Sequence, residues 1–448
     1  MINILALIVS LSLIMYLAYK GYSTIITAPI VALLTLIVII TAPIIGLLTL
    51  LLTFGLNSHL MVNYTEIYMS GFAGFVKNYF PLFLTGAIFA KLMEEAKYGK
   101  SIALFITNKL GKDKAILAVV LSGAFLTYGG VSLFVVAFIL YPLANILFKE
   151  ADIPKRLIPG TIALGAFTFT MTAMPGSPEI QNVIPMSYFG TDTFAAPFIG
   201  IIASITMLSL GLLWLNYRLK KARSFGEGYG KHKFKLEEIE NESLPCIFIS
   251  VLPILIIFIS NFTLSKIYYP NIDGSYLEKY GVSLDNVSGT WSVIISIVIA
   301  IIFILALNFK KLPNLNDILN IGVKNSFLPL LNSSAIVGYG SIIKSLPIFL
   351  TIQNTIMNVS SNPIISEAIS VNVICGLTAS ASGGLGISLN ALAPTFIQMS
   401  DALSISPEIL HRIASLSSGG LDTLPHNGAV ITTLAICSLT HKESYKDI

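Results

Sequence analysis

The stretch LTYGGVSLFVVAF, from Leu126 to Phe138, places two adjacent glycines inside a run that is otherwise almost entirely apolar. In a helix interior each glycine costs about 1 kcal/mol relative to alanine. A continuous helix would therefore rarely carry this pair. We predict that the backbone leaves the helical conformation at Tyr128–Gly130, and the surrounding sequence must explain why.

The composition excludes a soluble protein. The chain has 448 residues, of which 54% are hydrophobic and 11% are charged, whereas soluble domains carry about 25% charged residues. Long apolar runs recur at 25–52, 194–215, 247–259 and 293–307, which predicts a polytopic membrane protein. The first run, 2–17, lacks a basic segment before it and a cleavage site after it, so we expect a retained span.

Basic residues predict the orientation of the chain. Lysines and arginines crowd the loop from Arg218 to Lys235, which the positive-inside rule places in the cytoplasm. The same rule makes Lys114 and Lys149 cytoplasmic. Between them lie about 34 residues, too few at 1.5 Å per residue for two crossings of a ~30 Å hydrocarbon core. We therefore predict a re-entrant hairpin at 115–148, an external N-terminus and a cytoplasmic C-terminus.

The chain contains an internal duplication. SASGGLGISLNALAP (380–394) repeats the first glycine pair as Gly383-Gly384, at an offset of 383 − 129 = 254. MTAMPGSPEIQNVI (171–184) pairs with LDTLPHNGAVITTL (421–434), at an offset of 425 − 175 = 250 between the prolines. A weaker pair, 78–92 and 325–343, has an offset of 325 − 78 = 247. The three pairs of motifs occur in the same order and at nearly the same offset, which indicates that the chain contains two repeats.

The predicted topology gives the repeats opposite orientations. The fold class we predict is an all-α polytopic membrane protein with two inverted repeats, each containing a re-entrant helical hairpin and a discontinuous transmembrane helix. Inverted repeats with broken helices are typical of secondary transporters. The expected parts are a first repeat at 1–193 (hairpin 115–148, broken helix 157–188), a connecting span and basic loop at 194–243, and a second repeat at 244–448 (hairpin 364–394, broken helix 409–440).

The candidate site residues lie at the hairpin tips and helix breaks, where free backbone groups and half-helix N-termini suit a carboxylate. Ionisable residues at membrane depth are costly and usually functional, so Asp422, His426 and Glu179 are the candidates for ion coupling. Asp422 and His426 would share one face if their segment keeps a helical turn. The predicted substrate-binding residues are Thr127, Tyr128, Gly129, Gly130, Ser132, Ser177, Asn182, Ser380, Ser382, Gly383, Gly384 and Asn427.

Simpler interpretations stay open for each feature. Glycine pairs also serve as close-packing surfaces between helices, and Pro175 and Pro425 could be ordinary kinks. Asp422 and His426 could form a satisfied polar pair that holds the broken helix. The cysteines, at 246, 375 and 437, have no CxxC spacing, so we expect neither a metal site nor a disulfide framework.

Two other functional classes fit less well. An intramembrane enzyme would need a catalytic set such as HExxH or GxSxG, which the sequence lacks. A channel would share mid-membrane tips but would normally surround a pore axis formed by subunit symmetry.

Several motifs in one order carry a family resemblance: LTYGGVSLFVVAF, KRLIPGTIALGAFTFTM with PGSPEIQNVIP, GEGYG and LDTLPHNGAV. With these motifs the chain resembles the gluconate permease (GntP-type) family of bacterial organic-acid symporters over nearly its whole length, and most closely its hydroxybutyrate or short-chain acid branch. Members of that branch tend to carry an acidic residue where Thr172 stands and glutamine where Glu179 stands.

The resemblance implies uptake of a small carboxylate, such as gluconate, 3-hydroxybutyrate or another short-chain acid, with protons in a bacterial cytoplasmic membrane. The alternatives are a sodium-coupled carboxylate symporter and a cation/proton antiporter of the same fold. The resemblance also implies the ion-transporter type of fold, a homodimer, and a hairpin-bearing domain that moves against a scaffold. The expected partners are the carboxylate, the coupling ion and the lipid bilayer. We expect no cofactor and no nucleic acid.

Overall fold

The computed structural model describes residues 13, 30–31, 61–131, 133–230, 244–309, 312, 314–345, 360–378, 380–421, 423–425 and 427–448. Every regular element in these residues is a helix, which confirms the predicted all-α class. The predicted spans at 2–17 and 25–52 fall almost wholly outside the described residues. The chain forms two compact units, residues 1–83 with 327–427 and residues 84–326 with 428–448, and we describe each unit separately.

Four described helices are long and apolar enough to cross a membrane, at Asn63–Glu95, Pro197–Ser224, Ile247–Asn271 and Leu284–Asn308. They carry large apolar side chains on their surfaces. On α12 (Pro197–Ser224), for example, Phe198, Ile202 and Leu213 are 81%, 66% and 66% exposed. Such surfaces are stable against lipid and costly in water, so the helices agree with the predicted multi-pass membrane protein.

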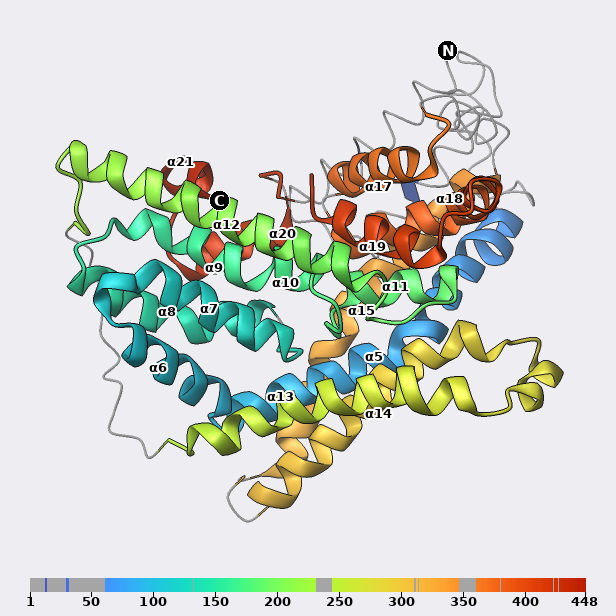
Figure 1. Ribbon diagram of the computed structural model, residues 1–448, viewed down its shortest axis with the longest axis horizontal. Helices are drawn as coiled ribbons and strands as arrows, with labels where there is room; N and C mark the ends of the chain where they lie inside the picture. The colour runs from blue at the N-terminus through green and yellow to red at the C-terminus, as the bar shows by residue number, and fades with distance from the viewer. Residues whose placement is uncertain are drawn as a thin grey trace. The chain divides into compact units, whose positions relative to one another are not determined.

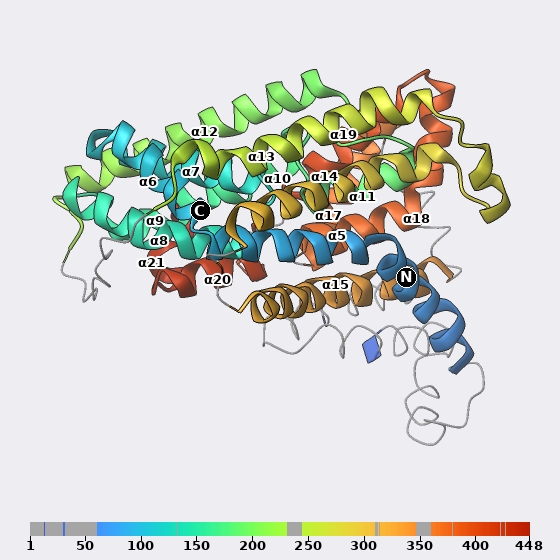
Figure 2. The same cartoon turned by 90° about the horizontal axis from the view of Figure 1, so that it is seen from below.

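The unit formed by 84–326 and 428–448 contains the first predicted hairpin. Helices α7 (Ala115–Tyr128) and α8 (Leu133–Glu150) form its arms, and α6 (Tyr98–Leu110) packs against both. The first broken helix follows as α9 (Ile158–Ala166), α10 (Phe169–Thr172) and α11 (Ile180–Phe189). The long helices α13 (Ile247–Phe262) and α14 (Leu284–Asn308) run side by side (Figures 1 and 2). The unit also contains α20 (Gly428–Ile436), α21 (His441–Ser444) and the short turns η2 (Lys112–Lys114), η3 (Lys155–Leu157), η4 (Thr263–Tyr268), η5 (Tyr269–Asn271), η6 (Ser275–Tyr280) and η7 (Tyr445–Asp447).

Glycines let helices of this unit approach each other closely. A Cβ atom added to Gly165 on α9 would lie 2.4 Å from the carbonyl oxygen of Val120 on α7. Only a residue without a side chain permits this approach. The hairpin arm α7 is therefore held directly against the first segment of the broken helix.

The unit formed by 1–83 and 327–427 contains the second predicted hairpin. Its arms are α17 (Pro363–Thr378) and α18 (Ala381–Ala402), and α19 (Pro407–Ser418) packs against both (orange to red in Figure 1). Helix α18 continues through Pro394, the predicted end of the hairpin, because a membrane helix can absorb one proline.

The chain passes between the units inside α5 (Met69–Glu95), inside α15 (Leu315–Ser345) and between α19 and α20. Helix α5 follows η1 (Asn63–Tyr68) and contains Pro81, and α15 contains Pro329. Each unit therefore takes residues from both halves of the chain. The repeat boundaries at 193 and 243, and the inversion of the repeats, stay predictions.

Candidate functional site: the first hairpin tip and the helix break

The first hairpin turns where the sequence predicts it. Helix α7 ends at Tyr128, α8 begins at Leu133, and Gly130 has a φ of 82°, a conformation that strongly favours glycine. The N–H of Gly129 donates to the carbonyl of Phe125 (3.1 Å), and the N–H of Gly130 donates to that of Thr127 (2.8 Å). The tip therefore satisfies these N–H groups internally, and a ligand there would have to displace their bonds or use other groups.

The predicted break of the neighbouring helix is also present. The chain between α10 and α11 leaves the helical path at 173–179, where Gly176 has a φ of 81°. The buried side chain of Asn182 closes this loop, because its Nδ2 donates to the carbonyls of Ser177 (2.8 Å) and Thr193 (3.0 Å). The N–H of Gly176 also donates to the Thr193 carbonyl (2.8 Å). Asn182 is thus a fixed part of the break.

The tip and the break are in direct contact. The hydroxyl of Tyr128 donates to the carbonyl of Pro175 (2.9 Å), an acceptor whose partner within the helix is lost at the break. A Cβ added to Gly130 would lie 3.3 Å from Cγ of Pro178, and one added to Gly176 would lie 3.0 Å from the Tyr128 hydroxyl. The hairpin tip and the helix break, which the sequence predicted separately, therefore form one site in the structure.

Buried oxygen atoms without hydrogen-bond partners occur on the elements that form this site. They are Thr127 Oγ1 at the tip, Gln181 Oε1 on α11 and Asn261 Oδ1 on α13. An unpaired buried polar group costs about 1–3 kcal/mol. These oxygens can accept hydrogen bonds from a hydroxylated ligand.

Glu179 stands at the N-terminus of α11 as its N-cap residue, and its carbonyl accepts bonds from the N–H groups of Asn182 and Val183. Its own N–H faces the hydroxyl of the buried Ser177 (3.4 Å). We predicted that this half-helix N-terminus would receive a substrate carboxylate. The chain places a carboxylate of its own there, which the helix dipole favours.

The second hairpin turns slightly earlier than predicted. Helix α17 ends at Thr378 and α18 begins at Ala381. Gly383 and Gly384 lie in the first turn of α18, where Ser380 Oγ accepts a bond from the Gly383 N–H (3.1 Å). A Cβ on Gly384 would lie 2.5 Å from Cα of Cys375, so this glycine holds the two arms together. Ser382 Oγ lies 3.3 Å from Ser333 Oγ of α15.

The second helix break is described only in part. Helix α19 ends at Ser418 and α20 begins at Gly428, so the described residues between them lie outside the helices, while the broken helix at 409–440 stays a prediction. Asn427 is buried, and its N–H donates to Leu424 (2.9 Å). Ser132, Asp422 and His426 lie outside the described residues, and their predicted roles stay predictions. The described residues between Asp422 and His426 are not helical, so the condition for the two to share a helix face is not supported.

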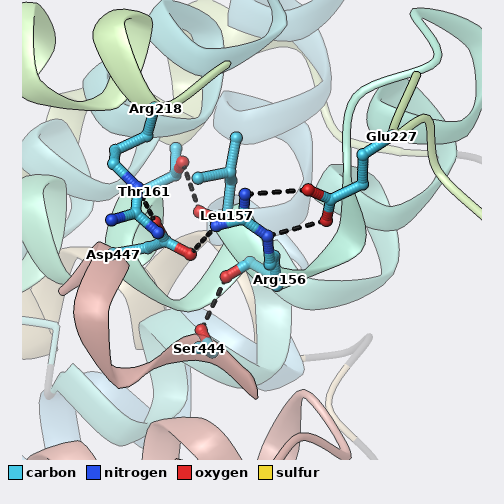
Figure 3. A network of polar contacts seen from close by, with 7 residues as sticks. All are labelled: Arg156, Leu157, Thr161, Arg218, Glu227, Ser444 and Asp447. Atoms are coloured by element: carbon cyan, nitrogen blue, oxygen red, sulfur yellow. Dashed lines mark hydrogen bonds and ion pairs between the residues drawn. The ribbon is translucent and has the colours of Figure 1, made fainter. Parts of the chain in front are cut away.

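A network of charged residues, which sequence reasoning did not assign, lies on the side predicted to be cytoplasmic (Figure 3). Arg156 forms a bidentate pair with Glu227 (Nε–Oε1 2.7 Å, Nη2–Oε2 3.0 Å) and a second pair with Asp447. Arg218 Nε lies 2.7 Å from Asp447 Oδ1, and the Ser444 hydroxyl donates to the Arg156 carbonyl (2.6 Å). The hydrogen bond from Arg156 and its charge hold the pKa of Glu227 below its usual range.

The GEGYG motif (226–230) has a local structural role in the same region. The N–H of Tyr229 donates to Asp152 Oδ1 (2.8 Å), and its hydroxyl bonds to Asn145 on α8. A Cβ on Gly228 would lie 2.3 Å from Asp152 Oδ1. The motif therefore attaches the end of α12 to the base of the first hairpin, a role that its loop position alone did not reveal.

The comparison with known families decides the class of the protein. Residues 22–419 match the GntP family permeases. The chain is a member of the GntP permease family. A Bacillus subtilis (strain 168) protein described as the uncharacterized transporter YxjC is 42% identical to this GntP permease, across all of this chain and 95% of that protein. An uncharacterized transporter of Haemophilus influenzae is 28% identical over 36% of each chain.

A solved structure agrees with the fold of this GntP permease. The YdaH transporter of Alcanivorax borkumensis, whose structure is described as having an unusual topology, superimposes with a TM-score of 0.54 at 14% identity. The match covers 85% of this chain and 82% of that one. At this identity the likeness concerns the fold alone.

Removing the bond between tip and break gives a first test of the site. We expect Tyr128→Phe to lower transport of the permease's substrate at low concentration by about fivefold, because a net hydrogen bond contributes about 1 kcal/mol. Tyr217→Phe is the matched control, since Tyr217 is 54% exposed on α12. Initial uptake rates in proteoliposomes measure both. Equal rates for Tyr128→Phe and Tyr217→Phe would show that the bond does not shape the site.

Proposed function

We propose that the protein is a secondary active transporter that takes up a small organic hydroxycarboxylate, such as gluconate, 3-hydroxybutyrate or another short-chain acid, together with protons. The contact between the first hairpin tip and the helix break, through Tyr128 and Pro175, is the observation that carries this proposal. Broken helices and hairpin tips are the parts from which carriers build substrate sites. Membership of the GntP permease family supports the transporter class.

In the proposed cycle the carboxylate and hydroxyl groups of the substrate bind at the two tips and breaks. The donors and acceptors are the residues named above as predicted substrate-binding groups, together with the unpaired oxygens of Thr127, Gln181 and Asn261. Asp422, His426 and Glu179 are the proposed coupling residues. A proton taken up with a monocarboxylate cancels its charge, so the loaded carrier crosses with little uncompensated charge. The proposed movement is of the elevator type, in a homodimer.

The proposed location is the bacterial cytoplasmic membrane, with the N-terminus outside and the C-terminus inside. The ion pair of Asp447 with Arg218 supports this arrangement, because it attaches the C-terminal segment to the basic loop that the positive-inside rule places in the cytoplasm.

Labelling of engineered cysteines tests the first hairpin. Asp113 lies before α7 and Glu150 ends α8, and both are exposed. We expect Asp113→Cys and Glu150→Cys to react with a membrane-impermeant thiol reagent only from the cytoplasmic face, because both arms start there. The native Cys246 is exposed and is first replaced by serine. Labelling of either position from outside would contradict the re-entrant hairpin.

Accumulation of radiolabelled gluconate, lactate and 3-hydroxybutyrate in proteoliposomes tests the function. We expect a pH gradient, inside alkaline, to drive one of these acids above its external concentration. Accumulation with a sodium gradient alone would favour the sodium-coupled alternative, and proton release on cation entry without any acid would favour a cation/proton antiporter. Flux that never exceeds equilibration would indicate a channel.

A further inference from the structure

The second hairpin contains a buried carboxylate, Glu367, which lies outside the predicted substrate-binding and coupling residues. Glu367 lies on α17, and its side chain is 0% exposed. The opposite face of α17 is open, since Ile365, Ile369 and Val373 are 47%, 44% and 45% exposed. Glu367 therefore points toward α18 and α19, which pack against α17.

Among the residues that the structure describes, neither carboxylate oxygen of Glu367 has a hydrogen-bond partner. The hydroxyls nearest in sequence on the same buried face donate elsewhere. Ser366 Oγ donates to the Ser360 carbonyl (3.0 Å), and Ser370 Oγ donates to the Ser366 carbonyl (2.6 Å). The carboxylate is thus enclosed by protein without compensation from its own helix.

Charged groups on the neighbouring elements do not compensate it either. On α18 the acidic residue is Asp401, which is exposed; α19 carries Glu408 and the fully buried His411 and Arg412. The last three each take part in an interaction of their own, and no ion pair in the described residues includes Glu367. The segment after α19 also reaches α17, where Leu421 lies beside Gly376, and the titratable residues of this segment are Asp422 and His426.

An isolated ionised carboxylate in such surroundings costs several kcal/mol even after the protein relaxes. One proton removes that charge completely. A proton binds to a single carboxylate oxygen, whereas a sodium ion needs several oxygen ligands around it. Protonation is therefore the simplest way for this enclosed carboxylate to lose its charge.

We propose that Glu367 is a proton-binding site of the transport cycle, separate from the coupling residues named above. The carboxylate takes one proton from the side where the second hairpin is open to water, remains a neutral carboxyl while it is enclosed, and returns the proton to water on the other side. No other bond changes. This inference rests on the proposed function for its role in transport, while proton binding itself can be measured without a substrate.

Glu367→Gln keeps the shape of the side chain and imitates the uncharged, protonated carboxyl group. The variant therefore separates proton coupling from substrate binding. In proteoliposomes we expect this variant to lose accumulation driven by a pH gradient, down to the level of liposomes without protein, while exchange of internal for external substrate continues. Asp401→Asn removes an exposed carboxylate from the same hairpin and should behave as wild type. Accumulation by Glu367→Gln with the wild-type dependence on pH would overturn the proposal, whereas the proposed function would stand.

Infrared spectroscopy tests the proton site when no transported acid is known. We expect the wild-type protein at neutral pH to show the carbonyl band of a buried protonated carboxyl group, and Glu367→Gln to lack it. If Glu367→Gln does not fold, Glu367→Asp retains an acid, and its band should titrate at a different pH from the wild-type band. Absence of any band that depends on Glu367 across the pH range would overturn the proposal, whatever the transport assays give.

Discussion

Valine in place of Gly384 is expected to abolish uptake and to reduce the yield of folded protein sharply. The Cβ of a substituted residue would lie 2.5 Å from Cα and 2.8 Å from the backbone N of Cys375. Because these are backbone atoms, the clash can be relieved only if α17 and α18 move apart. Overpacking of a tight interface costs about 1–3 kcal/mol for a small insertion, and a branched side chain at backbone distance exceeds the upper end of that range.

Gly74→Ala provides the matched control for this position. Gly74 also lies inside a helix, α5, and no atom of the described part of the chain comes within 4 Å of its added Cβ. Alanine there should raise stability slightly, since it is favoured over glycine in helices by about 1 kcal/mol. Thermal unfolding in detergent should therefore rank Gly74→Ala at or above wild type, then Gly384→Ala, then Gly384→Val. A Gly384→Val protein with wild-type melting temperature and affinity would refute the close packing of the two arms.

Loss of Arg156 is expected to have the second large effect, on the stability of the cytoplasmic network. The Asp447 carboxylate is fully buried, so Arg156→Ala leaves it with Arg218 as its remaining cation in the network of Figure 3. Removing one partner of a buried ion pair costs about 3–5 kcal/mol when the other charge is left uncompensated. Because Arg218 still pairs with Asp447, we expect a loss of stability below that range. The Arg156–Glu227 pair contributes less, because Glu227 is 42% exposed and such pairs are screened by water.

A double-mutant cycle separates the pair from its surroundings. Arg156→Ala and Asp447→Ala should each lower the melting temperature. The double variant should show a smaller decrease than the sum of the two single decreases, because the direct interaction between Arg156 and Asp447 is then lost only once. Lys446→Ala is the control, since Lys446 is an exposed cation of the same segment. Additive losses would show that Arg156 and Asp447 act independently.

The sequence predicted the first hairpin closely because several local signals coincide there. Lys114 and Lys149 limit its arms, and the glycine pair marks a turn in which Gly130 needs a positive φ. The second tip was displaced because the repeat alignment matched glycine to glycine. In the structure Gly384 has a different function from Gly130, since it packs against Cys375 within the hairpin instead of forming the turn.

Other features could not be predicted from one sequence for physical reasons. Arg156 and Asp447 are 291 positions apart, and no local pattern connects residues at such a separation. Glu367 is one acid in an apolar helix, so hydropathy windows average it away, and only packing shows that it is enclosed without a partner. Glu227 and Tyr229 belong to a motif that the sequence displays, yet their partners are known only from the fold.

The prolines of α5 and α15 lie beside the points where the chain passes between its two compact units. The passages lie at 83–84, 326–327 and 427–428. Pro81 and Pro329 stand within one helical turn of the first two, and each removes a backbone hydrogen bond and softens its helix against bending. The third passage lies where α19 has ended and α20 begins. Each passage between the units thus lies beside a proline that weakens its helix or outside the regular helices, whereas the packing of α7 on α9 and of α17 on α18 lies within single units.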